Sequence, residues 1–317
     1  MRPYQQFCGG RIFYHAAKKV GMMKPIIWKL RRNLHLLMLA PAVLLFFFFF
    51  LLPILQGMCF SFTNWDGFGR MEWIGLENYR AFFSDDRALN AVWNTLFFGI
   101  FGALLLNVLG LAIALLLDEG LKGSGLVRTL VYMPTIISSL IMGYIWGQIL
   151  SSEGGILKTT LESLSLSGLY SDWLSDPRAA RIVILIILLW QSIGGTMMIY
   201  ISGLQSLPES VHEAALVDGA GYFRELFRIK LPLLGPSLRV NIITNLISCM
   251  SIFDVIMSLT GGGPGFYTES LSLFIYKKSV SGSAGYSSAV AIILFLIILV
   301  PVTFSFIATK KMEDVSD

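Results

Sequence analysis

The residues best placed to do chemistry are two carboxylates, Glu213 and Asp218, in a polar insert. The insert, residues 205–236, reads QSLPESVHEAALVDGAGYFRELFRIKLPLLGP and separates two long apolar runs. A carboxylate at such a position can accept charge-assisted hydrogen bonds from an arginine or a backbone N–H of another protein. The small side chains of Ala214 and Ala215 would let a helix approach a partner closely. The insert therefore predicts a docking element for a separate protein.

Local patterns in the insert predict two short helices. Pro208 fits the first turn of one helix, where its missing N–H has no intrahelical role. Gly219 then allows a bend, because glycine reaches positive φ without a steric penalty. A second helix is expected from Tyr222 to Lys230, ended by Leu231 and Pro232. Such a segment is either a stiff lever between two spans or an ordinary amphipathic loop on the membrane surface.

The composition predicts an all-α polytopic membrane protein. Of the 317 residues, 55% are hydrophobic and 14% charged, whereas a soluble domain carries about 25% charged residues. A membrane span needs about 20 apolar residues, and its backbone must pair within the helix. Six blocks satisfy this requirement: 36–56, 91–117, 126–150, 181–204, 237–259 and 287–308. We expect an N-terminal segment 1–35, a six-span domain 36–308 and a tail 309–317.

The distribution of basic residues predicts which side of the membrane each loop faces. With the N-terminus in the cytoplasm, the insert and both termini lie inside. That arrangement places 16 of the 24 Lys and Arg residues on the inner side and 8 on the outer side, as the positive-inside rule favours. The formal net charge of +4 then reflects membrane topology and gives no reason to expect a nucleic-acid partner.

The chain shows no energy source or catalytic centre of its own. It has no Gly-x-x-x-x-Gly-Lys-Ser/Thr loop for nucleotide phosphates. Asp254 is the one acidic residue within a predicted span, which is weak support for ion coupling. The three cysteines are scattered, so neither a disulfide framework nor a metal pattern follows. His15, His35 and His212 all lie outside the spans, which disfavours an intramembrane enzyme.

The insert resembles the EAA loop of the permease subunits of bacterial ABC importers. The resemblance rests on Glu213-Ala214-Ala215, Asp218-Gly219-Ala220, Ile229, Leu231-Pro232 and Pro236. Further segments are similar to carbohydrate-type permeases, the group that contains the maltose permease. These segments are Ser61 to Trp65, Ile74 to Tyr79, Asn94 to Leu96, Tyr132 to Pro134, Thr260 to Pro264 and Gly285-Tyr286 with Ala289.

The resemblance implies a type I importer permease fold in a bacterial inner or plasma membrane. It implies a second homologous permease subunit, two ATPase subunits, an extracytoplasmic solute-binding protein, a sugar substrate and surrounding lipid. ATP and magnesium would be bound by the ATPase, so this chain would hold no cofactor and would not be an enzyme. The residues implied in ATPase coupling are Glu213, Ala214, Ala215, Asp218 and Gly219.

A sugar path through the spans needs polar side chains without fixed charge. The resemblance to the maltose permease implies path positions at Gln191, Ser192, Gly195, Asn245, Cys249 and Ile252. Other polar candidates on these helices are Gln148, Trp190, Thr196, Asn241, Thr244, Ser248 and Ser251. Such residues also bond helices to one another in membranes, so helix packing is the competing interpretation.

Two alternatives to a sugar importer remain open at this point. An ion-coupled secondary carrier would transport sugar by itself, without an ATPase. An importer of the same type could also carry a glycerol phosphodiester or a polyol.

Overall fold

The computed structural model describes residues 38–118 and 123–313, in two units that meet at Cys59 and Phe60. The predicted segment 1–35 lies outside the described residues, as do the last four residues of the predicted tail. The described part of the first unit is an apolar helix, Met38–Phe60, whose last residue is assigned to the second unit and whose mean hydropathy is 2.7. It includes a wide π turn at Phe47–Leu51, followed by α2 (Leu52–Phe60). Each unit is described by itself.

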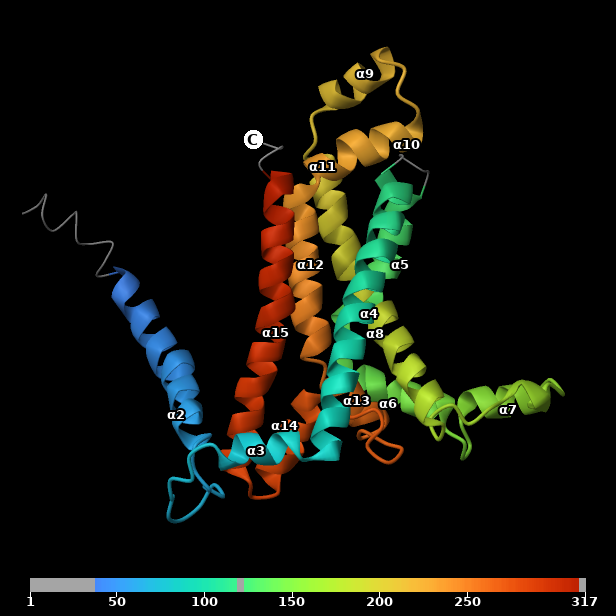
Figure 1. The fold of residues 1–317 in the computed structure, drawn as a ribbon. Helices are drawn as coiled ribbons and strands as arrows, with labels where there is room; N and C mark the ends of the chain where they lie inside the picture. Colours follow the sequence, from blue (N-terminus) through green and yellow to red (C-terminus); the bar gives the residue numbers. More distant parts are fainter. Residues whose placement is uncertain (1–37, 119–122, 314–317) are drawn as a thin grey trace, which may run out of the picture. The chain divides into compact units, whose positions relative to one another are not determined.

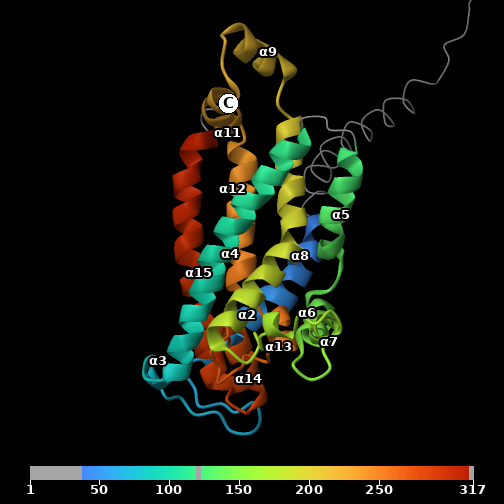
Figure 2. The ribbon, with the colours of Figure 1, turned by 90° about the vertical axis from the view of Figure 1, so that its right-hand side faces the viewer.

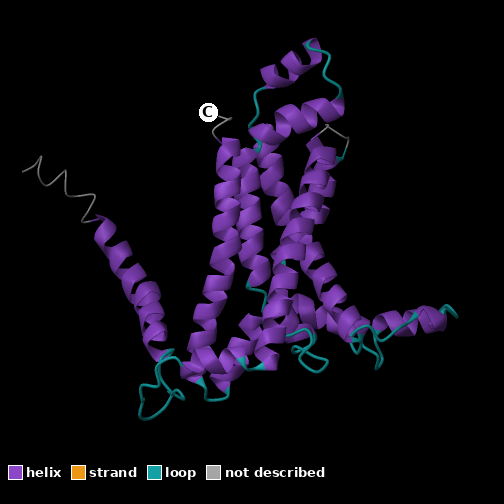
Figure 3. Cartoon of the chain, in the orientation of Figure 1, coloured by secondary structure: helices purple, strands orange, loops and turns teal. Residues whose placement is uncertain are grey.

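The described part of the second unit is helical throughout apart from loops and one isolated bridge between Thr63 and Trp73 (Figure 3). Its helices are α3 (Glu77–Phe83), α4 (Asp86–Asp118), α5 (Ser124–Ile136), α6 (Ser139–Leu150), α7 (Ile156–Ser163), η2 (Ser167–Leu169), α8 (Pro177–Gln205), α9 (Glu209–Val217), α10 (Tyr222–Glu225), η3 (Leu226–Lys230), α11 (Leu231–Leu233), α12 (Gly235–Met250), α13 (Asp254–Leu259), α14 (Leu271–Val280) and α15 (Ala284–Glu313).

Four long helices, α4, α8, α12 and α15, pack side by side as the body of this unit (Figures 1 and 2). One end of the bundle carries α9 and α10, and the C-terminal end of α15 lies there too. The other end carries α3, α6, α7, α13 and α14. The insert and the last helix thus meet the same end of the bundle, as the predicted topology requires.

The predicted fold is confirmed, except that the third span is bent and the fifth is interrupted between Met250 and Asp254. Five described helices are long and apolar enough to cross a membrane, and a bent helix pair brings the total to six. The bent pair is α5 and α6, which replace the single helix expected over 126–150 and meet at 96°. Pro134 lies just before the break, and Ile137 adopts an extended backbone.

Small residues set the close spacing between the helices of the bundle. A Cβ added at Gly110 of α4 would lie 2.7 Å from Thr196 Cγ2 of α8, and one at Gly194 would lie 2.6 Å from the Val131 carbonyl oxygen of α5. Lipid is as apolar as a leucine side chain, so close packing replaces the hydrophobic effect as the force between spans. These glycines therefore position α4, α5 and α8.

Candidate functional site

Helix α9 stands at one end of the bundle and presents the predicted coupling residues (Figure 1). Glu213, Ala214, Asp218 and Gly219 are exposed, whereas Ala215 is only 2% exposed. The helix therefore turns one face towards its own chain and offers its carboxylates to solvent. This arrangement suits the binding of a second protein.

The bend predicted at Gly219 is present. Gly219 has φ of +67°, and the N–H of Ala220 donates to the Ala215 carbonyl oxygen at 2.9 Å. This six-residue closure around a left-handed glycine is a Schellman cap. The cap satisfies a carbonyl at the end of α9 and sets the direction in which the chain leaves the helix.

The second predicted helix of the insert is present, but its predicted end at Leu231 and Pro232 is wrong. After α10 the chain forms the π turn η3, in which the Leu231 N–H donates to the Leu226 carbonyl, and helical backbone continues through Pro232. The turn comes only at Leu234. A π turn widens the helix locally, so the proline ring meets less crowding than in a regular α-helix.

The base of the insert contains a buried ion pair and lies against the end of α4. Glu225 is 6% exposed and lies 3.2 Å from the ammonium of Lys230. Lys230 and Leu226 line a small pocket with Leu115 and Asp118 at the end of α4. The base of the insert therefore lies against the end of α4.

Most of the predicted path residues lie inside the helix bundle. Asn245 and Thr196 exchange hydrogen bonds of 3.1 and 3.2 Å between α12 and α8. Cys249 and Ile252 are 0% and 5% exposed within an apolar core cluster. Ser192 and Gly195 are half-buried on α8. The role of these residues in transport stays a prediction.

A different polar stripe on the fifth span is exposed. Thr244, Ser248 and Ser251 are all exposed and follow one another at intervals of four and three residues. This spacing places Thr244 and Ser248 on one face of α12, with Ser251 directly after its end. The Thr244 hydroxyl donates to the Val240 carbonyl oxygen of its own helix at 2.7 Å.

Two spans are interrupted, and at each interruption a polar side chain bonds to a backbone carbonyl. At the α5–α6 break, Gln191 Nε2 donates to the Ile137 carbonyl oxygen at 2.8 Å. At the α12–α13 break, the Ser270 hydroxyl donates to the Ile252 carbonyl oxygen at 2.6 Å. A free backbone carbonyl in a membrane is costly, so these bonds stabilise the breaks. Gln191, predicted as a path residue, is therefore engaged in holding the third span.

The chain is similar in sequence to a known family of transport proteins. The sequence profile of a family described as "Binding-protein-dependent transport system inner membrane component" matches residues 107–313. The chain belongs to this family. The match covers the α5–α6 pair, the insert and both flanking long spans. It favours an importer component over the alternative of a carrier that works alone.

Relatives that match most of the chain support the assignment of this permease to the family. It is 31% identical over 298 residues to the probable starch degradation products transport system permease protein AmyD of Thermoanaerobacterium thermosulfurigenes, covering 94% of this chain and 99% of that one. It is 33% identical over 265 residues to the multiple sugar-binding transport system permease protein MsmF of Streptococcus mutans, covering 82% and 90%. A crystal structure of a bacterial ABC transporter involved in alginate import matches with a TM-score of 0.77 at 25% identity, covering 90% and 98%.

The permease also contains a charge cluster that the sequence analysis missed. Glu269 has a fully buried side chain, and Arg87 donates to both of its carboxylate oxygens at 2.6 and 2.8 Å. Lys277 lies 3.0 Å from the same carboxylate. Asn94 of α4 donates to the carbonyl oxygens of Tyr267 and Glu269 at 2.8 and 2.9 Å. These contacts fasten the loop after the fifth span to the start of α4.

The pairing of Arg87 with Glu269 spans 182 residues of sequence, so no local pattern pointed to it. Among the described residues, no group of three or more His, Cys, Asp and Glu side chains could hold a metal ion.

Proposed function

We propose that this permease forms half of the translocation path of an ATP-driven sugar importer. The observation that carries the proposal is the exposed α9, whose Schellman cap and buried Glu225 base make it a stiff lever between α8 and α12. The relatives described as permeases of starch products and of multiple sugars indicate the substrate class. A second, homologous permease chain completes the path.

The ATPase subunits dock at α9 in this proposal. Glu213 and Asp218 accept hydrogen bonds from the ATPase, and Ala214 allows a close approach at the helix surface. ATP and magnesium bind to that partner, and the closure of an ATPase pair moves α9. The positive-inside distribution of Lys and Arg supports a cytoplasmic position for this end of the bundle and for both termini.

Sugar enters from the opposite end, delivered by a solute-binding protein. The exposed Thr244, Ser248 and Ser251 line the path in this proposal, together with Ser192 and Gly195. Residues Gln191, Asn245, Cys249 and Ile252 lie behind that surface and shape it. The interruptions of the third and fifth spans supply the movable joints for alternating access, since backbone breaks absorb changes in φ and ψ.

Co-purification and transport assays on the assembled complex test this proposal. The permease is purified with its bound subunits, and these are identified by mass spectrometry. The complex is then reconstituted into vesicles with the solute-binding protein and screened against neutral sugars, polyols and glycerol phosphodiesters. We expect ATP-dependent sugar uptake and no uptake by the chain alone. Uptake by the isolated chain under an ion gradient would remove the ATPase from the account.

A further inference from the structure

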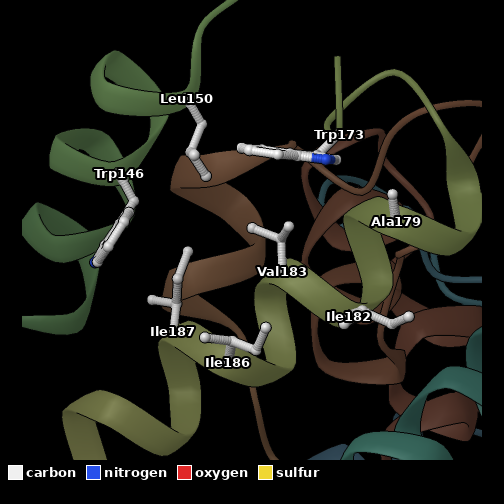
Figure 4. Close-up of a pocket in the computed structure, with 8 residues that line it drawn as sticks. All are labelled: Trp146, Leu150, Trp173, Ala179, Ile182, Val183, Ile186 and Ile187. Carbon is white, nitrogen blue, oxygen red and sulfur yellow. The ribbon is translucent and has the colours of Figure 1, made fainter. Parts of the chain in front are cut away.

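An apolar groove opens on the side of the bundle at the end opposite α9 (Figure 4). It has a volume of about 390 Å³, within the roughly 300–1,000 Å³ range of ligand pockets. Its walls include Trp146 and Leu150 of α6, Trp173 before α8, and Ile182, Val183 and Ile186 of α8. The lining side chains carry no charge, and the two indole nitrogens are their only polar atoms. A sugar would find no hydroxyl or amide partner there.

The depth of the groove matches one leaflet of a bilayer. Its lining on α8 extends from Ala179 to Ile187, and α8 begins at Pro177. At 1.5 Å per residue, these positions lie within about 15 Å of the helix start. Half of a hydrocarbon core is also about 15 Å thick. The groove therefore faces the acyl-chain region of the leaflet opposite α9, which is the outer leaflet in the proposed orientation.

The side chains in the groove are unlike those at the helix contacts of this protein. Where α8 meets its neighbours closely, the contacts are made through Gly194, Thr196 and Gly203. Membrane helix interfaces are enriched in such small residues, which let backbones approach. In the groove, the exposed side chains of α8 are the branched Ile182 and Ile186, and Ala179 is the one small lining residue. This contrast favours a flexible hydrocarbon chain over a second protein helix as the occupant.

A polar corner lies next to the groove, where a lipid headgroup would be. The Tyr170 and Trp173 rings are 6.0 Å apart, and the Lys158 ammonium lies 5.8 Å from the Tyr170 ring centre. Lys158 belongs to α7, which crosses the direction of the long helices in both views (Figures 1 and 2). Tyrosine, tryptophan and lysine are the side chains that anchor proteins at the membrane–water interface.

The corner also contains acidic side chains, and the two nearest α8 accept hydrogen bonds from neutral groups. The Asp172 carboxylate accepts a hydrogen bond from the Ser175 hydroxyl at 2.7 Å. Asp176 accepts the N–H groups of Arg178 and Ala179 at the start of α8. Lys158 is bonded to the Ser152 carbonyl oxygen at 2.9 Å, and the pKa of the neighbouring Tyr170 is raised by burial and by the negative charge of Asp172. The corner therefore carries charges of both signs, which complement the phosphate and the ammonium of a zwitterionic headgroup such as phosphatidylethanolamine.

We propose that this groove is a phospholipid site. One acyl chain lies between α6 and the first turns of α8, and the phosphate lies near Lys158 and Tyr170. Bulk lipid is as apolar as the groove, so the preference for the site comes from shape and from the headgroup. It is therefore modest, about tenfold over the lipid around the rest of the protein, or about 1.4 kcal/mol.

Photo-labelling tests the proposal on the assembled complex. The complex is reconstituted into vesicles of phosphatidylethanolamine and phosphatidylglycerol, with a trace of phosphatidylethanolamine that carries a diazirine on its acyl chain. After illumination, labelled residues are mapped by mass spectrometry. We expect labelling of α6 and the start of α8 about tenfold above that of the exposed apolar face of α15.

Two substitutions on α8 distinguish a built site from general lipid contact. Ile186→Trp fills the groove and should reduce labelling there to the α15 level. Met198→Trp adds the same bulk on the same helix at an exposed position outside the groove, and should leave the labelling unchanged. A third variant, Lys158→Ala, should lower labelling severalfold without closing the groove.

Two outcomes would overturn the proposal. Equal labelling of the groove and α15, unaffected by Ile186→Trp, would mean that lipid only surrounds this surface. Labelling of the groove in the isolated permease but not in the assembled complex would mean that another subunit covers it. Neither outcome bears on ATPase docking at α9, so the two proposals can fail independently.

Discussion

The left-handed turn at the end of α9 allows a quantitative test of the lever. Gly219 has φ of +67°, and a Cβ added there would meet no atom within 4 Å. A substitution at this position therefore affects the backbone and removes no contact. For a residue with a Cβ, the left-handed conformation costs roughly 1–2 kcal/mol. This cost corresponds to a factor of about 5–30 in the population of the native turn.

Gly219 and Gly221 of the insert provide a matched pair of sites for substitution. Gly221 also has open space around it, but its φ of −71° is ordinary and it occupies the N-cap of α10. Serine is favoured at an N-cap. Gly219→Ser should therefore weaken the turn, whereas Gly221→Ser should not. Gly219→Asn should resemble the unmodified protein, because asparagine tolerates the left-handed region.

The assay measures two quantities on the reconstituted complex. One is the affinity of the permease pair for its ATPase, and the other is ATP hydrolysis stimulated by the solute-binding protein. We expect Gly219→Ser to lower the affinity by up to about thirtyfold, since only the native turn is competent to bind. Equal behaviour of Gly219→Ser and Gly221→Ser would refute the argument that the turn sets the direction of the lever.

Four further predictions concern the charges and the path. Glu213→Lys should abolish ATPase association in co-purification while leaving the thermal stability of the permease unchanged, because this side chain is exposed; a lower melting temperature would indicate a folding defect instead. Glu269→Gln should lower the free energy of unfolding in detergent by about 3–5 kcal/mol, since it leaves Arg87 without its buried partner, and an unchanged melting temperature would contradict the cluster. Ser248→Val should raise the KM for sugar with assembly preserved. Asn245→Ala should alter sugar preference through its neighbours, and unchanged kinetics for every sugar would exclude it from the path.

The sequence predicted the membrane class, the spans and the insert because these depend on local composition. Long apolar runs must form helices in lipid whatever their neighbours are. The positive φ at Gly219 and the exposure of Glu213 also followed from local chemistry. The continuation of the helix through Pro232 did not follow from local chemistry, because the π turn that accommodates the proline depends on backbone geometry over several residues.

The tertiary structure decided which polar residues are exposed and which hold the bundle together. Composition alone cannot tell the exposed Ser248 from the buried Asn245, because both lie on the same helix and both are polar. The structure also decided the partner of Glu269, which depends on how α4 and the loop after the fifth span meet. The physical reason is the same in both cases: burial and pairing depend on packing between segments far apart in the chain, whereas the membrane spans depend on the segment itself.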